Sequence, residues 1–558
     1  MADTLDFTRI DVATQAAIVD YVNRAPAGWY LTGWRHGGRT VDDPAVGFSG
    51  SRPGYAIGTL VADRIVERRD HSSGGQISAL ADLQGIAGFG QDKLDDLAFT
   101  MSNLARHRNT VEFHADGPAC RRALLELIDS AERYVHFATF LYFNDSAGRA
   151  VEDALAAKAR AGIQVRVILD RHGSEASFNE DPTLTGRHNI GRLIGRLTDA
   201  GVLVLDSYPV SDRMPPAEIE ALADDGVPQA WVDEQLAIDG RWLADFNHAD
   251  HEKMVVVDGR RAAVLSCNVG DEYLYGSGAP RTGGGGRKPR WHDAMTVITG
   301  GAALSVHEQF TKRWFQLGGH RLEPNNAVFD FTDSFFAPQP VAAGSDGVTF
   351  ASCRPTEDPG LNVFDRPEPV EFDRNPIRRL YAVDLVAVAQ REVIIQNPYP
   401  IDAHVYETWL SGLERRPAVQ FRLIRPSMSV NDYPLANWPA LGSYIRWLFV
   451  RYDQLLLDAG ASLHEYRPGF NHLKCAVVDD WLATHGSYNI NYRSARKDFE
   501  FNVVVESKTY ASQMREIMTG DIDDSRRRRT PLQPSFIDRE AVQILRQLGA
   551  DWIIEQVG

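Results

Sequence analysis

The chain has 558 residues and carries 59 lysines and arginines against 75 aspartates and glutamates, which gives a formal net charge of −16 at pH 7. This acidic balance excludes a nucleic-acid binder that depends on overall positive charge, and leaves only a local basic groove for such a partner. The hydrophobic content of 44% and the charged content of 24% are ordinary for a folded globular protein and exclude global disorder. At about 150 residues per domain, the length predicts three or four folding units.

Residues 1–105 are predicted to be helical. Apolar residues recur at helical spacing in residues 55–65 and 80–94, around two turns that contain glycine. The pattern resembles the tandem helix-hairpin-helix unit of DNA-uptake and repair proteins over residues 15–98, in which the glycine turn lets backbone N–H groups meet a phosphate. The first turn departs from that unit because it lacks a second glycine, and residues 28–54 interrupt it. Contact with DNA and a small helical docking module therefore both stay open.

Residues 106–335 are predicted to form an α/β unit. A helix around residues 124–128 precedes an apolar run over 134–143, and a helix over 150–161 precedes a second apolar run over 163–170. Helices that alternate with strands indicate a sheet with crossover connections.

The third block, residues 345–558, repeats this order of elements. Two halves with one order of elements indicate a duplication. We therefore predict an α/β chain with two similar halves, preceded by the small helical domain and ending in a C-terminal helical extension. A linker is predicted over 337–344, before this block. The predicted elements of the block are helices over 377–389 and 406–413 and strands over 393–399 and 419–425.

Each half contains one copy of the same motif, His-x-Lys-x4-Asp, in a β-rich run. Because side chains alternate along a strand, the histidine and the lysine are expected to project from one face. The aspartate closes the strand and is predicted to begin a hairpin turn. A single copy is typical of an edge strand with solvated polar residues, whereas two copies in matching repeats indicate one shared site. The motif residues are His251, Lys253 and Asp258 in the first half and His472, Lys474 and Asp479 in the second.

A short strand follows each motif and ends in Ser-x-Asn, and each half has a later acidic residue. Histidine acts as nucleophile or general acid near neutral pH, and a carboxylate fixes the imidazole tautomer. Lysine, asparagine and serine are the predicted ligands of the phosphoryl oxygens. One half supplies one histidine, and a double displacement at phosphorus needs two. The candidate site residues outside the two motifs are Ser266, Asn268 and Asp293 in the first half and Ser487, Asn489 and Glu500 in the second.

The paired motifs resemble those of the phospholipase D superfamily over residues 106–510. The sequences at residues 268–273, 291–293 and 486–489 are similar to its cardiolipin-synthase-like branch. The resemblance implies two halves, each a mixed sheet flanked by helices, packed around one active site without metal or cofactor. It also implies that one histidine, expected to be His251, forms a phosphohistidine while the other protonates the leaving alcohol.

The same resemblance assigns the site residues by position. We interpret the two motif aspartates, Asp258 and Asp479, as residues that support the structure of the site. A Ser-Cys pair precedes Asn268 where the family usually has Gly-Gly or Gly-Ser, which predicts a narrower first phosphate pocket. The two transmembrane helices typical of bacterial cardiolipin synthases have no counterpart in the sequence. The catalytic set comprises His251, Lys253, Asp258, Asp293, His472, Lys474, Asp479 and Glu500.

Four other segments attract attention. The insertion over 276–290, with four consecutive glycines, is predicted to be a plain loop because no strand-turn-helix context surrounds it. Residues 247–251 match no zinc-ligand spacing. The arginine run over 526–529 follows several aspartates, so it is interpreted as a self-neutralising cluster, with contact to anionic lipid or nucleic acid as the alternative. Aromatic residues in 438–452 fit an acyl-chain groove and core packing equally well.

Cysteine usage and apolar runs bear on the compartment. The four cysteines are scattered without a C-x-x-C pair, which argues against a disulfide framework or a zinc cluster and favours a reducing compartment. No run reaches the ~18 apolar residues of a membrane span, and residues 1–7 lack the features of a secretory signal. We therefore expect a cytoplasmic protein that meets a membrane only at its surface, with no obligate protein partner.

The sequence leaves three candidate functions from different classes. The favoured one is a phosphodiesterase that hydrolyses or transphosphatidylates phospholipids, because both motifs are on one acidic chain. The alternative is a nuclease that binds nucleic acid through residues 1–100, although DNA contact normally needs a basic surface. A binding module with a vestigial site is the third, and two intact motifs argue against it.

Overall fold

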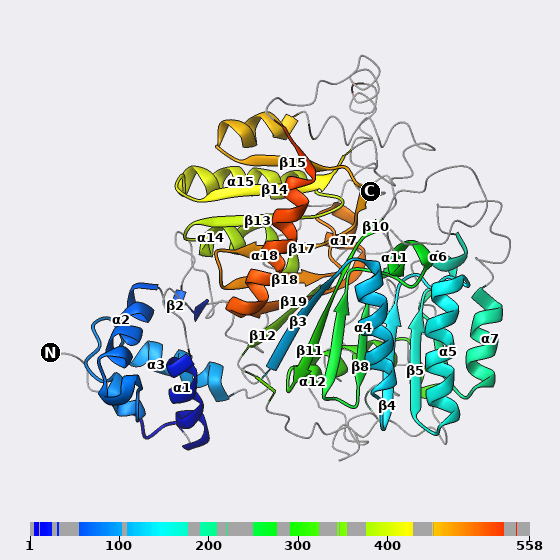
Figure 1. Cartoon of the computed structure of the whole chain (residues 1–558), viewed down its shortest axis with the longest axis horizontal. Helices are drawn as coiled ribbons and strands as arrows, with labels where there is room; N and C mark the ends of the chain where they lie inside the picture. Colours follow the sequence, from blue (N-terminus) through cyan, green and yellow to red (C-terminus); the bar gives the residue numbers. More distant parts are fainter. Residues whose placement is uncertain are drawn as a thin grey trace.

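The computed structural model (Figure 1) has a helical part near the N-terminus beside two larger α/β halves, each built on its own sheet. Both halves are mixed sheets flanked by helices, which confirms the predicted fold class. The residues that the structure describes are 5–10, 12–24, 31–32, 55–57, 59–102, 109–176, 190–208, 220, 249–275, 291–322, 343–344, 346–353, 375–427, 449, 451–528 and 543.

Most of the described N-terminal residues form helices that share a small core around Ile18, Ile65 and Leu94. The prediction of helix is wrong for residues 55–57, which form a strand paired antiparallel with residues 31–32. Gly85 and Gly88 have φ values of 79° and 82°, a left-handed conformation that glycine adopts without steric cost, and they form the second predicted glycine turn. The first predicted glycine turn lies outside the described residues. The elements are α1 (Val12–Arg24), β1 (Leu31–Thr32), β2 (Tyr55–Ile57), α2 (Thr59–Asp70), η3 (Ser73–Gly75), η4 (Leu80–Leu83) and α3 (Gln91–Ser102).

The first half contains a seven-stranded sheet. Three of its strands are parallel and are joined by crossover helices, as the alternating pattern predicts, and the other neighbours are antiparallel. In spatial order the strands are β3 (Asn109–Ala115), β11 (Ala294–Gly300), β9 (Arg261–Leu265), β8 (Met254–Val257), β4 (Tyr134–Thr139), β5 (Gln164–Leu169) and β6 (Leu203–Asp206).

The second half repeats this strand order, so the duplication inferred from the sequence is visible in the topology. One further edge strand, β20 (Ser525–Arg528), pairs antiparallel with the last strand of the repeat. The repeated strands, in spatial order, are β12 (Gly347–Cys353), β19 (Asp498–Glu506), β18 (Leu482–Gly486), β17 (Cys475–Val478), β13 (Glu392–Gln396), β14 (Gln420–Pro426) and β15 (Ser462–Tyr466).

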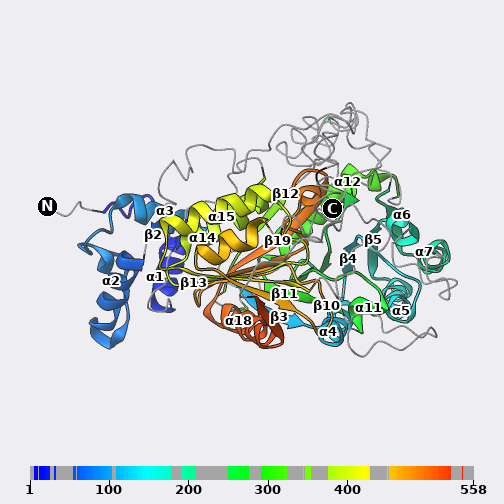
Figure 2. The same ribbon diagram turned by 90° about the horizontal axis from the view of Figure 1, so that it is seen from above.

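Helices cover both faces of each sheet, and in Figure 2 α14 and α15 lie on one side of the second sheet and α18 on the other. The first sheet carries α4 (Gly117–Asp129), α5 (Ser146–Arg160), α6 (Arg171–Ala176) and α7 (Ile190–Asp199), with α12 (Ala303–Gln316) on the opposite face. The second carries α13 (Pro376–Arg379), η10 (Leu380–Asp384), α14 (Leu385–Val388) and α15 (Ala403–Arg415), with α18 (Lys508–Asp523) opposite.

One hydrophobic core joins the halves. It combines the inner faces of both sheets with α12 and α18, and includes Val264, Phe310, Val503 and Met514. The two sheets therefore bring the ends of β8 and β17, where the motifs lie, into one region. The short elements that complete this region are β7 (Ala249–Asp250), α11 (Asp271–Leu274), β10 (Trp291–His292), η7 (Gly319–Leu322), β16 (Phe470–Asn471) and α17 (Tyr492–Arg496).

Several predictions concern segments that the structure describes only in part. Of the aromatic stretch over 438–452, Phe449 and Tyr452 are buried in the core of the second half, so core packing is their role. The insertion over 276–290 and most of the 337–344 linker lie outside the described residues, as does nearly all of the C-terminal extension. The arginine run is described through Arg528, where it forms β20.

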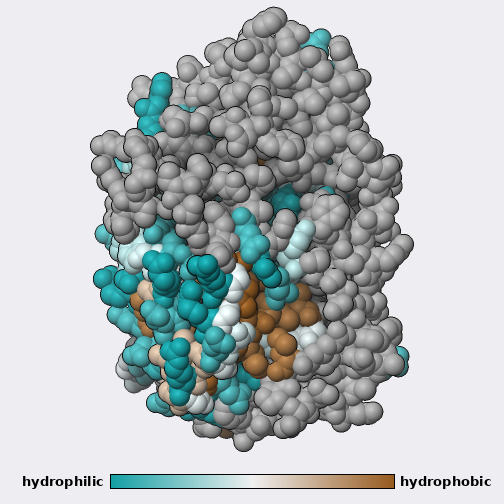
Figure 3. All heavy atoms as spheres, turned by 90° about the vertical axis from the view of Figure 1, so that its right-hand side faces the viewer, coloured by the Kyte–Doolittle hydropathy of each residue, from teal (hydrophilic) through white to brown (hydrophobic). Residues whose placement is uncertain are grey.

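The described helices and the molecular surface bear on membrane contact. None of these helices is both long and apolar enough to cross a membrane. Viewed from the right-hand side of Figure 1, where α7 lies, the described surface shows a hydrophobic patch with hydrophilic side chains on one side of it (Figure 3). β6 is the edge strand there, and its first three residues are half-buried.

Candidate active site

The motif histidines and lysines lie just before the strands on which we expected them. β8 and β17 each begin one residue after the motif lysine, so the prediction that these residues lie on the strand is wrong. Their backbone is nevertheless held locally, because each lysine ammonium donates to the carbonyl of its own histidine. The distance is 2.7 Å from Lys253 Nζ to His251 O and 2.8 Å from Lys474 Nζ to His472 O. All four side chains are buried.

Two short parallel strand pairs join the halves at the motifs. β7 pairs with the start of β19, and β10 pairs with β16. The N–H of His251 extends the first pair by donating to the Phe499 carbonyl at 3.0 Å, and the N–H of His472 extends the second by donating to the His292 carbonyl at 2.9 Å. Each motif histidine therefore lies beside the residue that precedes the late acid of the other half.

This pairing gives each histidine a carboxyl group from the opposite half. His251 Nδ1 lies 3.0 Å from both carboxyl oxygens of Glu500, and His472 Nδ1 lies 3.0 and 3.1 Å from those of Asp293. A carboxylate on Nδ1 fixes the tautomer and leaves Nε2 for the reacting atom. Each half therefore depends on the other for the carboxyl group that binds its histidine.

Two buried interactions hold the short strands in place, and the sequence analysis found neither. Arg313 of α12 binds Asp250 in β7, with Nη2 2.9 Å from Oδ2. Asp521 of α18 binds His292 in β10 at 3.0 Å and Gln396 at 2.7 Å. The helices α12 and α18 follow the equivalent strands β11 and β19, so the same element of each half secures one inter-half strand. In the sequence, each interaction could have been recognised from a charged residue on the apolar face of a helix, Arg313 in α12 and Asp521 in α18.

The two predicted serine ligands face the protein rather than an open pocket. Ser266 Oγ donates to Asp293 Oδ1 at 2.7 Å and accepts from Ala294 N at 3.0 Å. Ser487 Oγ accepts from Phe501 N at 3.0 Å. Both hydroxyl groups are fully buried, so in this structure they position the strands and carboxyl groups beside the histidines.

The two asparagines are also buried, with exposures of 3% for Asn268 and 7% for Asn489. Asn268 Oδ1 accepts from the backbone N–H of Leu141 at 3.1 Å. Asn489 Oδ1 has no hydrogen-bond partner among the residues that the structure describes. A buried amide of this kind is available to a polar substrate.

The motif aspartates lie at the far ends of β8 and β17. Asp258 accepts hydrogen bonds from the backbone N–H groups of residues 132–134 at 2.8 to 2.9 Å, and Asp479 accepts from those of residues 390–392 at 2.8 to 3.0 Å. Both have positive φ, 54° and 52°, in the hairpin turns that the sequence predicts. Their interactions are those of the structural supports that we expected.

Burial controls the protonation of the site. It lowers the pKa of both histidines, that of His472 to about 3, and it lowers the pKa of Lys253 to about 8 and that of Lys474 to about 7. Burial also raises the pKa of Glu500 to about 8. For Asp293, burial is outweighed by its cationic neighbours and hydrogen bonds, which lower the pKa. A phosphodiester anion beside both lysines favours their charged forms, so the site is suited to such a substrate.

The surroundings of the two histidines differ. The Trp291 ring lies 4.8 Å from the ring of His472, and Lys474 Nζ lies 2.7 Å from its Nε2. His251 packs against Phe140 with 5.1 Å between ring centroids, and no protein group is hydrogen-bonded to its Nε2 within the described residues. The two histidines of the site therefore differ in the neighbours of their Nε2 atoms.

Comparison with known proteins relates this geometry to a family. Residues 124–277 and 383–522 match a family model described as "Cardiolipin synthase, PLD-like domain". The chain is 24% identical over 498 residues to cardiolipin synthase 1 of Staphylococcus epidermidis, covering 88% of this chain and 82% of the relative. It is 26% identical over 427 residues to the major cardiolipin synthase ClsA of Bacillus subtilis, covering 75% and 70%. The crystal structure of phosphatidylserine synthase from Haemophilus influenzae shares the fold, with a TM-score of 0.53, 14% identity, and coverage of 82% of this chain and 98% of that one.

Proposed function

We propose, because the chain belongs to the family of cardiolipin synthase, PLD-like domains, that it is a phosphatidyltransferase of the phospholipase D type that acts on phospholipids. The main support for the proposal is that two histidines lie in one buried site and that each is hydrogen-bonded to a carboxyl group of the other half. The relatives that are named cardiolipin synthases support a phospholipid substrate.

In the first step, His251 Nε2 attacks the phosphorus of the phospholipid. A P–N bond forms and the bond from phosphorus to the leaving alcohol oxygen breaks, while His472 Nε2 takes a proton from Lys474 and passes it to that oxygen. Lys253, Lys474 and the asparagine amides stabilise the charge on the phosphoryl oxygens. Positive charge develops on the attacking imidazole, and the Glu500 carboxyl group beside Nδ1 stabilises it, most strongly where Glu500 is ionised.

In the second step, an alcohol or water replaces the protein at phosphorus. His472, now neutral, removes the proton of the incoming hydroxyl group, whose oxygen forms a bond to phosphorus as the P–N bond breaks. His472 returns this proton to Lys474, so the catalyst is back in its initial state with both rings neutral and His251 free. Attack by water gives hydrolysis, and attack by an alcohol gives transfer.

The assignment of His251 as nucleophile rests on the unequal states of the two rings. Lys474 is hydrogen-bonded to His472 Nε2 and is a proton donor to the atom that must protonate the leaving group. His251 Nε2 has no such neighbour in the described part of the chain and keeps its lone pair for phosphorus. Burial lowers the pKa of both rings, so the assignment depends on the different neighbours of the two Nε2 atoms and not on their pKa.

Capture of the intermediate by an added alcohol tests the proposed function. Purified protein is incubated with vesicles of phosphatidylglycerol and zwitterionic phospholipid, with and without ethanol or glycerol. We expect part of the product to change from phosphatidic acid to the corresponding phosphatidyl alcohol, because water and alcohol compete for one covalent intermediate. Mass spectrometry of the lipid extract measures the ratio.

The nuclease alternative is tested in parallel with plasmid DNA and RNA. Nuclease activity that falls steeply with salt, together with no release of any lipid head group, would contradict the lipid assignment while leaving the two-histidine chemistry intact. Alcohol added without any phosphatidyl alcohol in the product would contradict transfer.

Activity is expected to survive excess EDTA. Lysines and asparagines occupy the positions around the histidines where a metal-dependent phosphodiesterase needs carboxylate ligands. Head-group release is measured before and after dialysis against chelator, with a calcium-dependent phospholipase as a positive control for metal removal. Loss of activity that one divalent ion restores would contradict the proposed site.

For the N-terminal helices, we propose a packing role, and the helix-hairpin-helix interpretation stays a hypothesis. Trp481, in the turn between β17 and β18, packs against both the N-terminal core and the core of the second half. In the second glycine turn, Arg64 Nη1 donates to the Ala87 carbonyl at 2.7 Å, so this turn already bonds to the neighbouring helix. DNA binding would require the backbone N–H groups of the same turn to face a phosphate.

A further inference from the structure

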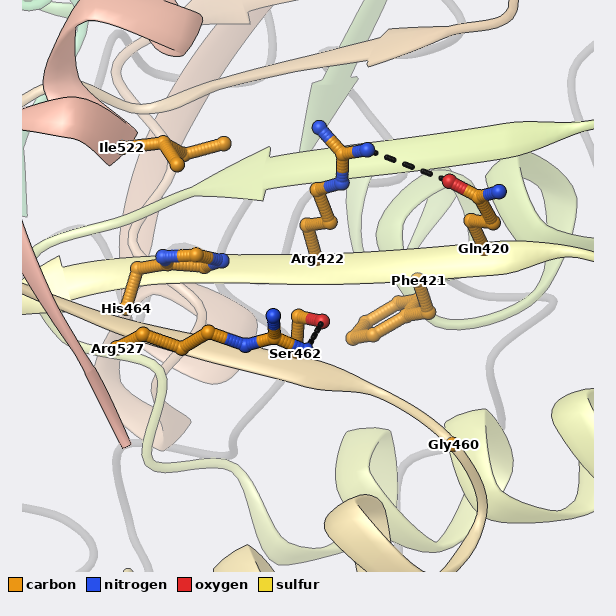
Figure 4. A pocket seen from close by; sticks show the side chains of 8 residues that line it. All are labelled: Gln420, Phe421, Arg422, Gly460, Ser462, His464, Ile522 and Arg527. Carbon is orange, nitrogen blue, oxygen red and sulfur yellow. Dashed lines mark hydrogen bonds between the residues drawn. The ribbon is translucent and has the colours of Figure 1, made fainter. Parts of the chain in front are cut away.

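A cavity of about 440 Å³ lies on the second sheet, where β14, β15 and β20 run side by side (Figure 4). None of the predicted site residues lines it, and its volume is within the range of small-ligand sites. Its lining combines polar and basic side chains with the apolar residues Phe421 and Ile522. The lining residues are Gln420, Phe421, Arg422, Gly460, Ser462, His464, Ile522 and Arg527.

The strand register explains why the polar side chains converge. Arg422 lies opposite Ser462 across the β14–β15 pair, and His464 lies opposite Arg527 across the β15–β20 pair. Residues two apart on one strand share a face, so these four side chains project from the same face of three adjacent strands. The arginine run that the sequence analysis left open thus contributes one arginine to this cavity.

His464 is the feature that points to a ligand. Only 5% of the residue is exposed, and neither ring nitrogen has a hydrogen-bond partner among the described residues. Burying an imidazole without partners costs free energy, so such a group is expected to meet a polar partner in its working state. Burial and the nearby Arg527 lower its pKa to about 4, so the ring is neutral and offers one N–H donor.

The charges around the cavity leave an excess of positive charge. Arg422 Nη2 lies 2.9 Å from Glu392, but Glu392 is shared with Arg515. Arg527 donates to Ser462 Oγ at 3.2 Å and has no ion-pair partner within the described residues. Of the acidic residues at the end of α18, Asp521 is bound to His292 and Gln396. Two guanidinium groups therefore line the cavity, and within the described residues Glu392 is the carboxylate that forms an ion pair with one of them.

We propose that this cavity binds a phosphate group, held by Arg422 and Arg527 and by the N–H of His464. Guanidinium groups match phosphate oxygens in geometry and charge. The hydroxyl of Ser462 is a further hydrogen-bond donor on the same face of the sheet. The phosphate belongs either to a phospholipid head group at the membrane surface or to a small phosphate ester in solution. The inference does not depend on the proposed transferase activity, because the cavity shares no residue with the two-histidine site.

The register supplies a matched pair of variants. Arg526 and Arg527 are neighbours on β20, both are exposed, and they project from opposite faces. Arg527→Gln removes one charge from the cavity, and Arg526→Gln removes the same charge from the other face. His464→Phe keeps an aromatic ring and removes both unpartnered nitrogens, so it is expected to raise the unfolding temperature in phosphate-free buffer.

Calorimetric titration with inorganic phosphate at constant ionic strength measures binding in the full-length wild type and the variants. We expect Arg527→Gln and His464→Phe each to weaken one binding event by about tenfold or more, and Arg526→Gln to bind as the wild type does. Head-group release from detergent-dispersed lipid is expected to be unchanged in all three. Equal phosphate binding in the wild type, Arg527→Gln and His464→Phe would overturn the proposal, and so would an equal loss in Arg526→Gln.

Vesicle sedimentation then identifies the source of the phosphate. If it is a lipid head group, phosphatidylglycerol vesicles bind the wild type and Arg526→Gln more strongly than Arg527→Gln, whereas phosphatidylcholine vesicles do not separate the variants. If it is a soluble ester, glycerol 3-phosphate distinguishes the variants in the titration and vesicles of neither composition do. Either pattern supports the cavity as a phosphate site, and absence of both contradicts it.

Discussion

Replacing either His251 or His472 with alanine is expected to lower the rate of head-group release by about 10⁴-fold or more. A double displacement needs a nucleophile and an acid at the same phosphorus, so each single variant removes one indispensable step. The double variant is expected to be no slower than the slower single variant, because residues that act as a unit are not additive. Head-group release from mixed micelles, at matched protein folding by circular dichroism, measures the effect.

An exposed histidine provides the control for this experiment. His404 lies on the surface of α15, and His404→Ala is expected to keep full activity. Rapid quenching with phosphate-labelled substrate is expected to trap the label on His251. Label on His472 instead would reverse the assignment of nucleophile and acid, and substantial activity in either alanine variant would contradict a single site with two histidines.

Replacing the inter-half carboxyl groups is expected to have the second largest effect. Asp293→Asn leaves His472 without an anionic partner, and the loss in rate is expected to be about 10²- to 10⁴-fold. Glu500→Gln is expected to cost less at pH 6 to 7. Burial raises the pKa of Glu500 to about 8, so its carboxyl group is mostly protonated in that range and an amide resembles it.

The pH dependence distinguishes the two positions. Because a raised pKa means that ionisation begins only above neutral pH, the wild type gains the Glu500 carboxylate as the pH rises through about 8. The ratio of wild-type to Glu500→Gln activity is therefore expected to increase across that interval. Asp293 has a lowered pKa and is ionised throughout, so the corresponding ratio for Asp293→Asn is expected to stay constant from pH 6 to 9.

Loss of a carboxyl group elsewhere on β19 is the control. Glu506 is buried at the other end of this strand, and Glu506→Gln is expected to show no change in the pH profile, even if its stability falls. Identical ratios for Glu500→Gln and Asp293→Asn at every pH would contradict the unequal protonation of the two carboxyl groups.

The elements of the two halves and the two copies of the motif could be predicted from the sequence, because both depend on local information. Hydrophobic runs and helical periodicity recur in the same order in each half, and one order of elements favours one sheet topology. Likewise, two copies of His-x-Lys-x4-Asp are visible without any structure, and so are the turns at Asp258 and Asp479, where the chain reverses between short strands.

The tertiary structure alone decided how these residues are combined. The partner of His251 is Glu500, 249 residues away, because β7 pairs with β19 of the other half rather than with a strand of its own sheet. No local pattern encodes that pairing, since it arises from the packing of two sheets on α12 and α18. The same holds for Ser266, whose hydroxyl is turned onto Asp293, and for the phosphate cavity, which exists only because the register of three strands places Arg422, His464 and Arg527 on one face.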